Sequence, residues 1–519
     1  MNPDFLINQE AKLEQIEVLA YGLGLTNKHD ACEFYGRHIA KIDASKLNDL
    51  PRKAKLVLVT AINPTPAGEG KTTTTIGLSD ALCKLGKKSI VCLREPALGP
   101  VFGIKGGATG GGYSQVAPSD KINLHFTGDF AAIASAHNLL AAMIDNHIWQ
   151  GNELGIDKVT WRRVIDMNDR ALRDQFDIVV ASEVMAILCL STSPGDLRDR
   201  LARIVIGYNK EKEVTSGDLR VAGAMAALLV DAIKPNLVQT LENNPALVHG
   251  GPFANIAHGC NSVIATDLAM KLGEYVVTEA GFASELGAEK FLDIKRRSSG
   301  LNPDVVVIVA TVRALKHHGD GDLSVGFNNL KAHILNMRDN FNLRTVVCIN
   351  KFKDDTQEDL DYIQHNAKEY ADDCVVSNHW GKGSAGALDL ANSVICTASK
   401  SDGKATYIYD SSDRFTDKIS KVAKKVYGVK DVLFPLEVQV KLRDWQDKYG
   451  EFPICVSKTH KSILPVPGQN FVWVNDVELR AGAGFIVVKL GNVITLPGLP
   501  KIPAAENIDV INGKIIGIN

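Results

Sequence analysis

Runs of consecutive apolar residues recur along most of the chain, and segments with helix-like spacing lie between them. Residues 1–50 place Ile7, Leu13, Ile16 and Leu19 near helical spacing, which predicts a helical lead-in. The later runs have the composition of buried strands: Leu56–Ile62, Ser89–Leu93, Ile178–Ala181, Tyr275–Thr278, Val305–Ala310 and Thr345–Ile349. Because such strands alternate with helices, the pattern predicts an α/β fold with a doubly wound, mostly parallel sheet.

The pattern changes toward the C-terminus, where charged helices and short strands replace the long apolar runs. A polar helix is predicted over 354–371, a strand over 374–376 and a charged helix at the end of 400–430. Further strands are predicted at Ile454–Ser457, Phe471–Val474, Gly484–Lys489 and Val493–Leu496. These changes predict three domains: an α/β nucleotide-binding domain at 1–304, a second α/β domain at 305–399 and a smaller α+β domain at 400–519.

A phosphate-binding loop of the P-loop type is predicted between the first strand and a helix over 74–84. Its residues are Thr65, Pro66, Ala67, Gly68, Glu69, Gly70, Lys71 and Thr72. In such a loop backbone N–H groups and the helix dipole face an anion, Lys71 reaches the outer phosphates and Thr72 can hold Mg²⁺. The usual pattern opens with glycine where this chain has Thr65, so the motif indicates a nucleotide phosphate without naming a reaction.

Three further segments carry candidate chemistry near the ends of predicted strands. Arg94 follows the second strand and could clamp a carboxylate or a transferring phosphoryl group, or pair with a surface glutamate. The glycine-rich run 103–113 is either a site loop, which we favour, a mobile lid or a connector. His125 and Asp129 lie four residues apart, on one helical face or across a turn at Gly128. His125 could act as a base or bind an anion and Asp129 could contact metal-bound water, although a lone histidine is more often structural.

Two aromatic residues follow neighbouring strands in the predicted sheet. Phe352 comes directly after one strand and Trp380, in a glycine-rich turn, after the next. They could sandwich a flat ring or simply pack in the core. The segment Asn350–Asp354 resembles the guanine-reading N-K-x-D motif, but its aspartate comes one residue late, which argues against a GTPase.

Composition restricts the class of partner. The 519 residues include 58 basic and 60 acidic side chains, for a net charge of -2, so no nucleic-acid or membrane partner is indicated. The nine cysteines contain no C-x-x-C pair, and the N-terminus lacks the features of a signal peptide. Reduced thiols in a cytoplasmic protein are therefore expected.

Taken together, the motifs resemble those of the formate–tetrahydrofolate ligases, also called 10-formyltetrahydrofolate synthetases. The matching stretches run in one order from about residue 65 to 505: TPAGEGKTTTTIGL, LREPALGPVFGIKGGATGGGYSQV, INLHFTGD, TEAGFASELGAEKFLDIK, VIVATVRALK and AGAGFIVVKLGNVITLPGLPKIPAA. The missing first glycine of the phosphate loop also belongs to that family's form of the motif. No dehydrogenase or cyclohydrolase domain precedes the ligase region, so the resemblance implies the monofunctional form.

The resemblance implies a reaction in which formate, tetrahydrofolate and MgATP give 10-formyltetrahydrofolate, ADP and phosphate through formyl phosphate. It implies that Thr65–Thr72 cradle ATP, that Lys71 and Arg94 hold the transferring phosphoryl group, and that Phe352 and Trp380 stack on the pterin of a folate that can be polyglutamylated. It also implies a homotetramer activated by K⁺ or NH₄⁺.

The chain departs from the common family pattern near the predicted folate pocket. Lys353-Asp354 and Gly381 follow the two aromatic residues, where Pro-Thr and Ala are common, and Ser457–His460 replaces a frequent Ala-Lys-Thr-Gln. Two other classes of function are weighed against the ligase. A nucleotide-dependent switch or metal-chaperone GTPase would carry a Cys/His cluster. A folate-binding protein without catalysis would not need Lys71, Thr72 and Arg94.

Overall fold

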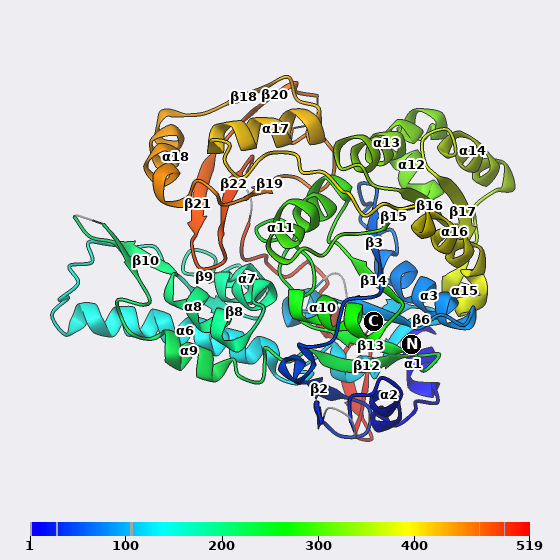
Figure 1. Cartoon of the computed structure of the whole chain (residues 1–519), viewed down its shortest axis with the longest axis horizontal. Coiled ribbons are helices and arrows are strands. Elements are labelled where there is room, and N and C mark those ends of the chain that lie inside the picture. Colours follow the sequence, from blue (N-terminus) through cyan, green and yellow to red (C-terminus); the bar gives the residue numbers. More distant parts are fainter. Residues whose placement is uncertain are drawn as a thin grey trace.

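A large sheet passes through the middle of the molecule, with helices on both of its faces (Figure 1). The computed structural model describes residues 3–26, 30–103, 107–210, 212–466, 468–491 and 494–518. Within these residues the sheet has twelve strands in the order β1-β2-β12-β13-β4-β14-β3-β15-β16-β17, with β6 paired to β12 and β5 to β6. The strands are β1 (Cys32–Phe34), β2 (Ala40–Ile42), β3 (Lys55–Ala61), β4 (Ser89–Leu93), β5 (Gly110–Gly111), β6 (Ser114–Ala117), β12 (Asn236–Thr240), β13 (Pro245–Val248), β14 (Tyr275–Glu279), β15 (Val305–Ala310), β16 (Thr345–Asn350) and β17 (Asp373–Ser377).

From β13 to β17 every neighbouring pair of strands is parallel, which confirms the predicted α/β class with a mostly parallel sheet. The predicted strands at β3, β4, β14, β15, β16 and β17 agree with the structure to within a residue or two at each end. The antiparallel strands β1, β2, β12 and β6 extend the sheet on one side. The carboxyl ends of the parallel strands therefore meet at one edge, where α/β sheets usually bind ligands.

Most residues of β3 are apolar because both faces of the strand are buried. Val57 and Val59 pack in one cluster with α3 (Lys71–Lys84) and α16 (Leu388–Ser399). Leu56 and Leu58 belong to a second cluster that includes buried residues of α10 (Val263–Leu272) and α13 (Leu323–Leu335). Each such side chain contributes about 1.5–3 kcal/mol through burial. A strand covered on both sides does not show the alternation of a half-exposed strand.

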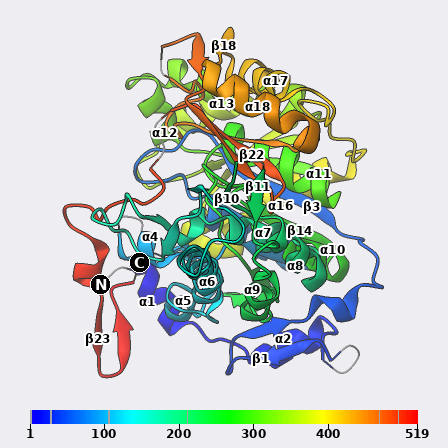
Figure 2. The ribbon, with the colours of Figure 1, turned by 90° about the vertical axis from the view of Figure 1, so that its left-hand side faces the viewer.

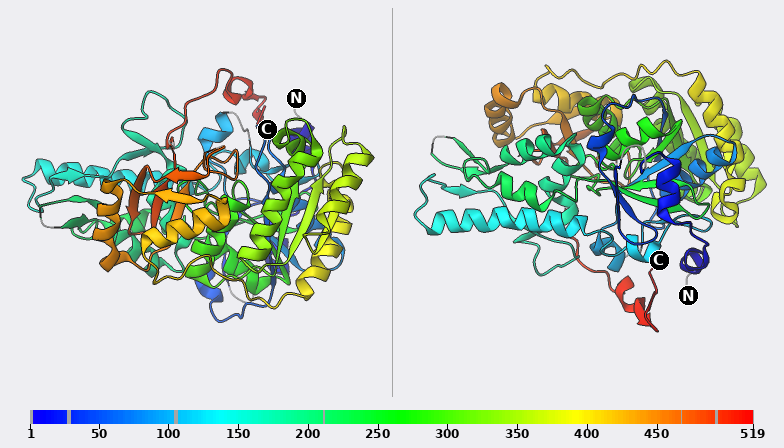
Figure 3. Two further views of the ribbon diagram at one scale, coloured as in Figure 1. Left: turned by 90° about the horizontal axis from the view of Figure 1, so that it is seen from above. Right: turned by 60° about the horizontal axis from the view of Figure 1, so that its bottom comes forward.

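Part of the chain projects from the sheet as a helical lobe (left in Figure 1), and its long helix α6 (Asp129–Trp149) is clearest in the right-hand view of Figure 3. With it lie α7 (Glu183–Leu190), α8 (Pro194–Ala202) and α9 (Ala222–Leu228), together with two small sheets. These sheets contain β7 (Lys158–Val159), β10 (Val205–Tyr208) and β11 (Glu213–Thr215), and β8 (Arg163–Ile165) with β9 (Phe176–Ile178).

The strand predicted at Ile178–Ala181 is wrong. Ile178 ends β9, which pairs with β8 outside the central sheet, and Val179–Ala181 form a 3₁₀ turn. The Ser182 hydroxyl accepts a hydrogen bond from the Val184 amide and begins α7, whose residues are all buried. A helix that is buried on every side has the same apolar composition as a buried strand, so periodicity alone could not separate them.

The C-terminal part packs two helices, α17 (Phe415–Tyr427) and α18 (Leu436–Tyr449), against short strands. These strands are β18 (Asp431–Leu433), β19 (Ile454–Ser457), β20 (Phe471–Trp473), β21 (Asp476–Arg480) and β22 (Phe485–Lys489). The strand predicted at Val493–Leu496 is not formed over Ile494–Leu496, and Val493 lies outside the described residues. A last hairpin, β23 (Asp509–Ile511) and β24 (Lys514–Ile516), projects beside the N-terminal helix α1 (Pro3–Glu10) (Figure 2), where Phe5, Val101 and Ile518 form a small buried cluster.

The remaining helices connect or cover the sheet: α2 (Ile16–Gly22), α4 (Leu98–Phe102), α5 (Ser119–Ile122), α11 (Arg296–Ser299), α12 (Val312–His318), α14 (Gln357–Ala367) and α15 (His379–Lys382). Of the helical lead-in predicted over 1–50, the described residues form only two α-helices, α1 and α2, and β1 and β2 follow them. The strands β15–β17 of the predicted middle domain continue the sheet that contains β3. The division of the chain at residues 305 and 400 stays a prediction. In the described ranges, no helix combines the length and apolar character needed to cross a membrane.

Candidate active site

The predicted site residues follow strands that are neighbours in the sheet. Strand β14 lies between β4, which leads to Arg94, and β3, which leads to the Thr65–Thr72 loop. On the other side of β3, β16 leads to Phe352 and β17 to Trp380. Residues up to 315 positions apart in the chain are therefore collected at one edge by the parallel strand order.

The Thr65–Thr72 loop is shaped from within by one of its own side chains. The buried Glu69 carboxylate accepts hydrogen bonds from the Thr65 amide (2.7 Å) and hydroxyl (2.9 Å) through Oε1, and from the Thr311 hydroxyl (2.5 Å) through Oε2. Gly68 and Gly70 adopt φ values of 75° and 76°, which favour glycine. Lys71 and Thr72 begin α3, so the loop ends at the N-terminus of a 14-residue helix. The N–H groups at the N-terminus of a helix, together with the helix dipole, suit an anion.

Asn350, the last residue of β16, supports the loop from the neighbouring strand. Its side-chain amide donates to the Glu69 carbonyl (3.1 Å), and a Cβ on Gly70 would lie 2.4 Å from the same nitrogen. Gly70 therefore permits both the loop conformation and the close approach of Asn350. In the segment that follows Asn350, the Asp355 carboxylate accepts a hydrogen bond from the Phe352 amide (2.8 Å).

Arg94 lies near a carboxylate that the sequence analysis did not select. The Glu279 carboxylate accepts from the Thr72 hydroxyl (2.8 Å) through Oε2, and its Oε1 lies 3.7 Å from Nη2 of Arg94. Glu279 is 5% exposed and Arg94 26% exposed, so Arg94 is not an ordinary surface side chain. The Glu279 carboxylate thus lies between Thr72 of the loop and Arg94.

His125 and Asp129 do not share a helical face. His125 is exposed in a turn, and Asp129 begins α6 after Gly128, whose φ is 89°. Asp129 is buried, forms an ion pair with Lys41 (2.7 Å) and accepts from the Asn236 amide (2.8 Å). This is a structural environment for Asp129, since a buried carboxylate needs such partners.

Glu95 lies between this ion pair and the candidate site, directly after Arg94 in the chain. Burial raises the pKa of its carboxyl well above the usual range, and the nearby Asp129 carboxylate raises the pKa further. Its Oε2 is buried without a hydrogen-bond partner in the described part of the chain.

Trp380 packs against the glycine-rich run, of which residues 104–106 lie outside the described residues. The Trp380 carbonyl accepts from the Tyr113 amide (2.9 Å), and a Cβ on Gly112 would lie 2.0 Å from that carbonyl oxygen. Gly112 also has a φ of 57°, so a larger residue would be strained here. The indole is 47% exposed. The glycine run therefore provides close backbone packing beside a solvent-facing aromatic ring.

Phe352 faces a cation from helix α12. The Arg313 guanidinium lies 4.8 Å from the centre of the Phe352 ring and donates to the Gly68 carbonyl (2.7 Å). Phe352 is 40% exposed. The two aromatic residues are thus both open to solvent, and one of them is tied to the Thr65–Thr72 loop through Arg313.

Comparison with known proteins decides the family. A family model described as "Formate--tetrahydrofolate ligase" matches residues 2–519. The chain belongs to this family.

Individual relatives agree along their whole lengths. Proteins named formate–tetrahydrofolate ligase from Methylibium petroleiphilum and Methylobacillus flagellatus are each 51% identical, over 563 and 558 aligned positions, and each comparison covers 100% of both chains. The relative from Methylococcus capsulatus is 49% identical over 556 positions, covering 99% of this chain and 100% of its own. The resemblance inferred from the motifs is confirmed.

Glu279 was not among the predicted site residues of this ligase-family chain, although its sequence position indicates the ligand edge. Glu279 ends an apolar run in the motif Thr278-Glu279-Ala280-Gly281, and an acidic residue at the carboxyl end of a buried strand points to the ligand edge. Arg313 gave no comparable signal, because its contact with the Thr65–Thr72 loop depends on the strand order.

The Ser457–His460 segment of this ligase-family chain borders the same edge. His460 stacks on Phe282 (ring centres 4.7 Å apart, planes at 18°), and Phe282 has a φ of 59°, which is rare for a bulky residue. The buried Lys458 ammonium pairs with Glu285 (3.1 Å). The Ser457–His460 segment therefore joins the C-terminal part to the residues that follow β14.

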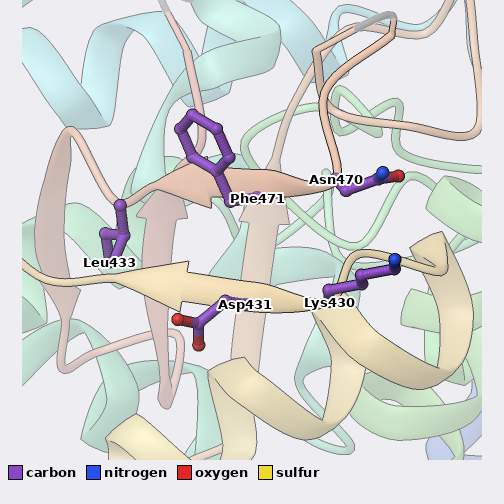
Figure 4. Close-up of a pocket in the computed structure, with 5 residues that line it drawn as sticks. All are labelled: Lys430, Asp431, Leu433, Asn470 and Phe471. Atoms are coloured by element: carbon purple, nitrogen blue, oxygen red, sulfur yellow. The ribbon is translucent and has the colours of Figure 1, made fainter.

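Two hollows of this ligase-family chain lie elsewhere. One of about 410 Å³ lies on the β18–β20 pair and is lined by Lys430, Asp431, Leu433, Asn470 and Phe471 (Figure 4). The other, of about 960 Å³, opens beside Ser89 at the opposite edge of the central sheet, where Lys53, Lys88 and Lys271 line it. Neither is lined by a predicted site residue.

Proposed function

We propose that this chain catalyses the ATP-dependent ligation of formate to tetrahydrofolate, giving 10-formyltetrahydrofolate, ADP and phosphate. Membership of the ligase family over residues 2–519 supports this reaction. The observation that carries the proposal is the placement of Arg94 beside the Thr65–Thr72 loop, with only the end of β14 between them. A nucleotide phosphate and a small carboxylate can then meet at one edge.

In the first step a formate oxygen attacks the γ-phosphorus of ATP, and the bond to the bridging oxygen breaks to release ADP. Lys71 at the start of α3 and Arg94 directly after β4 are proposed to hold the oxygens that carry the transferring charge. Formyl phosphate results. Positioning and charge stabilisation are the main contributions that a protein can make to such a transfer.

In the second step N10 of tetrahydrofolate attacks the formyl carbon. The C–O bond to phosphate breaks, inorganic phosphate leaves with the oxygen that came from formate, and the nitrogen loses its proton. Phe352 and Trp380, both partly exposed, are proposed to stack on the pterin. His125 is proposed to act as a base or to bind an anion, and Asp129, which pairs with Lys41, is proposed to contact metal-bound water.

Magnesium is proposed to bind with ATP. The Thr72 hydroxyl and the Glu279 carboxylate, 2.8 Å apart, are oxygen ligands of the type Mg²⁺ takes from proteins when phosphates supply the rest. When bound, the ion would neutralise charge on the phosphate oxygens. For the proposed monovalent cation, K⁺ or NH₄⁺, we propose the ionised carboxylate of Glu95 as one ligand, because its Oε2 is buried without a hydrogen-bond partner among the described residues.

The wider setting is also a proposal. We propose a cytoplasmic homotetramer that accepts tetrahydrofolate, including polyglutamylated forms. Sedimentation equilibrium would measure the assembly, and a mass of one chain, 56.1 kDa, would contradict a tetramer.

The reaction is tested by leaving out one substrate at a time. Purified protein is incubated with MgATP, formate and tetrahydrofolate, and the folate product is measured by absorbance after acid cyclisation. The proposal expects product, and phosphate release, only with all three substrates. ATP turnover at the same rate without formate or without tetrahydrofolate would contradict it.

A further inference from the structure

Glu279 occupies a position that no other carboxylate of the described site shares. It ends β14, between the strand that leads to Arg94 and the strand that leads to the Thr65–Thr72 loop. Its two oxygens face different sides: Oε2 accepts from the Thr72 hydroxyl (2.8 Å), and Oε1 lies 3.7 Å from Nη2 of Arg94. The side chain is 5% exposed, so these partners replace most of its contact with water.

A negative charge at this point matters because it lies between two proposed anion sites. An unpaired carboxylate would oppose both the nucleotide phosphates and formate, since like charges repel more strongly where water is excluded. Glu279 is therefore compatible with bound substrates only while a cation compensates it. In the described structure Arg94 is a cation near Glu279, and with nucleotide bound Mg²⁺ would be another.

Arg94 is held in place from its other side by backbone. A Cβ on Gly281 would lie 2.9 Å from Nη1 of Arg94, so the guanidinium rests against the glycine two residues after Glu279. Its Nε is buried without a hydrogen-bond partner among the described residues. Hence the orientation of Arg94 depends on its contacts with Gly281 and Glu279. A change in the Glu279 contact would change the orientation of the Arg94 guanidinium.

We propose that Glu279 is a positioning residue that couples nucleotide binding to formate binding. Without nucleotide it restrains Arg94. When MgATP binds, the Thr72 hydroxyl and the Glu279 carboxylate turn to the nucleotide-bound cation, and the Arg94 guanidinium becomes free for the formate carboxylate. This inference rests on the proposed function. By linkage, formate must strengthen nucleotide binding by the same factor as nucleotide strengthens formate binding.

The coupling is measured by titration calorimetry of formate into the protein, with and without the Mg²⁺ complex of the non-hydrolysable analogue AMP-PNP. We expect formate to bind the wild-type protein at least about fivefold more tightly with the nucleotide, the lower end of typical couplings. In Glu279→Gln the amide no longer restrains Arg94 by charge. Formate should then bind more tightly than in wild type when nucleotide is absent, and the ratio of the two affinities should fall to about one.

Glu437→Gln is the matched control, because Glu437 is an exposed glutamate on α18. It should keep the wild-type ratio. A wild-type ratio of one, or a Glu279→Gln ratio equal to that of wild type, would overturn the inference. The reciprocal titration of Mg-AMP-PNP with and without formate tests the same coupling in the wild-type protein, so the inference remains testable if Glu279→Gln does not fold.

The two proposals fail in different ways. If wild type makes no formyl folate in the substrate-omission assay, the proposed function is wrong. If wild type makes product but shows no coupling, only the role of Glu279 is wrong.

Discussion

At the residue scale, the directions of side chains at the sheet edge separate groups that face a substrate from groups that build the site. Glu69 lies inside the predicted phosphate loop, yet its carboxylate turns inward to Thr65 and Thr311. Asp129 pairs with Lys41, 88 positions away in the chain. Sequence spacing could not show either contact, because one depends on a side-chain direction and the other on distant segments meeting. Arg94, in contrast, was predicted from its position after a buried strand to lie at the same sheet edge as the Thr65–Thr72 loop, and it does.

Arg94→Ala is expected to lower kcat for formyl transfer by about 10²–10³ while affinity for ATP changes little. The reason is that a donor to the transferring group acts mainly in the transition state. Steady-state kinetics and ATP titration measure both effects. Arg443→Ala, which removes an exposed arginine on α18, is the control and should leave both unchanged. Unaltered turnover in Arg94→Ala would refute its role.

Trp380→Ala is expected to raise the KM for tetrahydrofolate about tenfold with a smaller effect on the KM for ATP. Its indole is partly exposed, and loss of ring stacking removes binding energy for a flat substrate. Initial-rate kinetics with each substrate varied in turn give the two constants. Trp149→Ala, at the exposed end of α6, should change neither. A selective rise in the ATP KM would place the stacking site elsewhere.

At the element scale, the parallel strands were predictable and their order was not. Each of the strands from β3 to β17 that carries a site residue is a continuous β-branched or apolar run, which the sequence displays directly. Strand β14 lies between β3 and β4 because it pairs with both, although it is distant from them in the chain. This strand order brings Glu279 into the site. The antiparallel β12–β13 hairpin was missed because both strands are short and β12 contains the polar residues Asn236, Gln239 and Thr240.

Gly77→Ala tests the packing of α3 against α15. A Cβ at Gly77 would lie 2.7 Å from the His379 Cβ and 2.8 Å from the Ser114 hydroxyl oxygen. We expect overpacking to lower the free energy of unfolding by about 1–3 kcal/mol. Gly223→Ala is the matched control in α9, where no atom lies within 4 Å, and it should raise stability by about 0.4–1 kcal/mol. Urea unfolding measures both, and equal effects of the two substitutions would contradict the packing argument.

The same contact predicts sensitivity to acid. Burial lowers the pKa of His379 to about 4, and its ring nitrogens bond to the hydroxyls of Ser377 (2.8 Å) and Thr74 (3.1 Å). An unfolded histidine has a pKa of about 6.5, so the folded state excludes a proton that the unfolded state binds below this pH. Stability is therefore full above about pH 6.5 and falls as the pH drops toward 4, by about 2 kcal/mol for this group at pH 5.

His379→Gln should reduce this loss between pH 7 and pH 5, as measured by urea unfolding at several pH values. His365→Asn, at an exposed position of α14, should leave the pH dependence as it is in wild type. An identical acid loss in all three proteins would show that His379 does not contribute.

At the scale of the whole molecule, a single sheet positions the groups that are proposed to bind the three substrates. The Thr65–Thr72 loop, Arg94, Phe352 and Trp380 all follow parallel strands of that sheet, and the C-terminal part reaches the same edge through Lys458 and Glu285. Family membership could be inferred from motif order alone, and it was confirmed over nearly the full length. The central proposal is that formate, and not water, accepts the γ-phosphoryl group.

The fate of the formate oxygen tests this claim most directly. The protein is incubated with MgATP, tetrahydrofolate and [¹⁸O]formate, and the inorganic phosphate is analysed by mass spectrometry. The account predicts that each phosphate released carries one oxygen from formate, because that oxygen leaves with phosphorus when N10 takes the formyl group. Phosphate that carries no ¹⁸O from formate, and instead gains oxygen from ¹⁸O-labelled water, would contradict it.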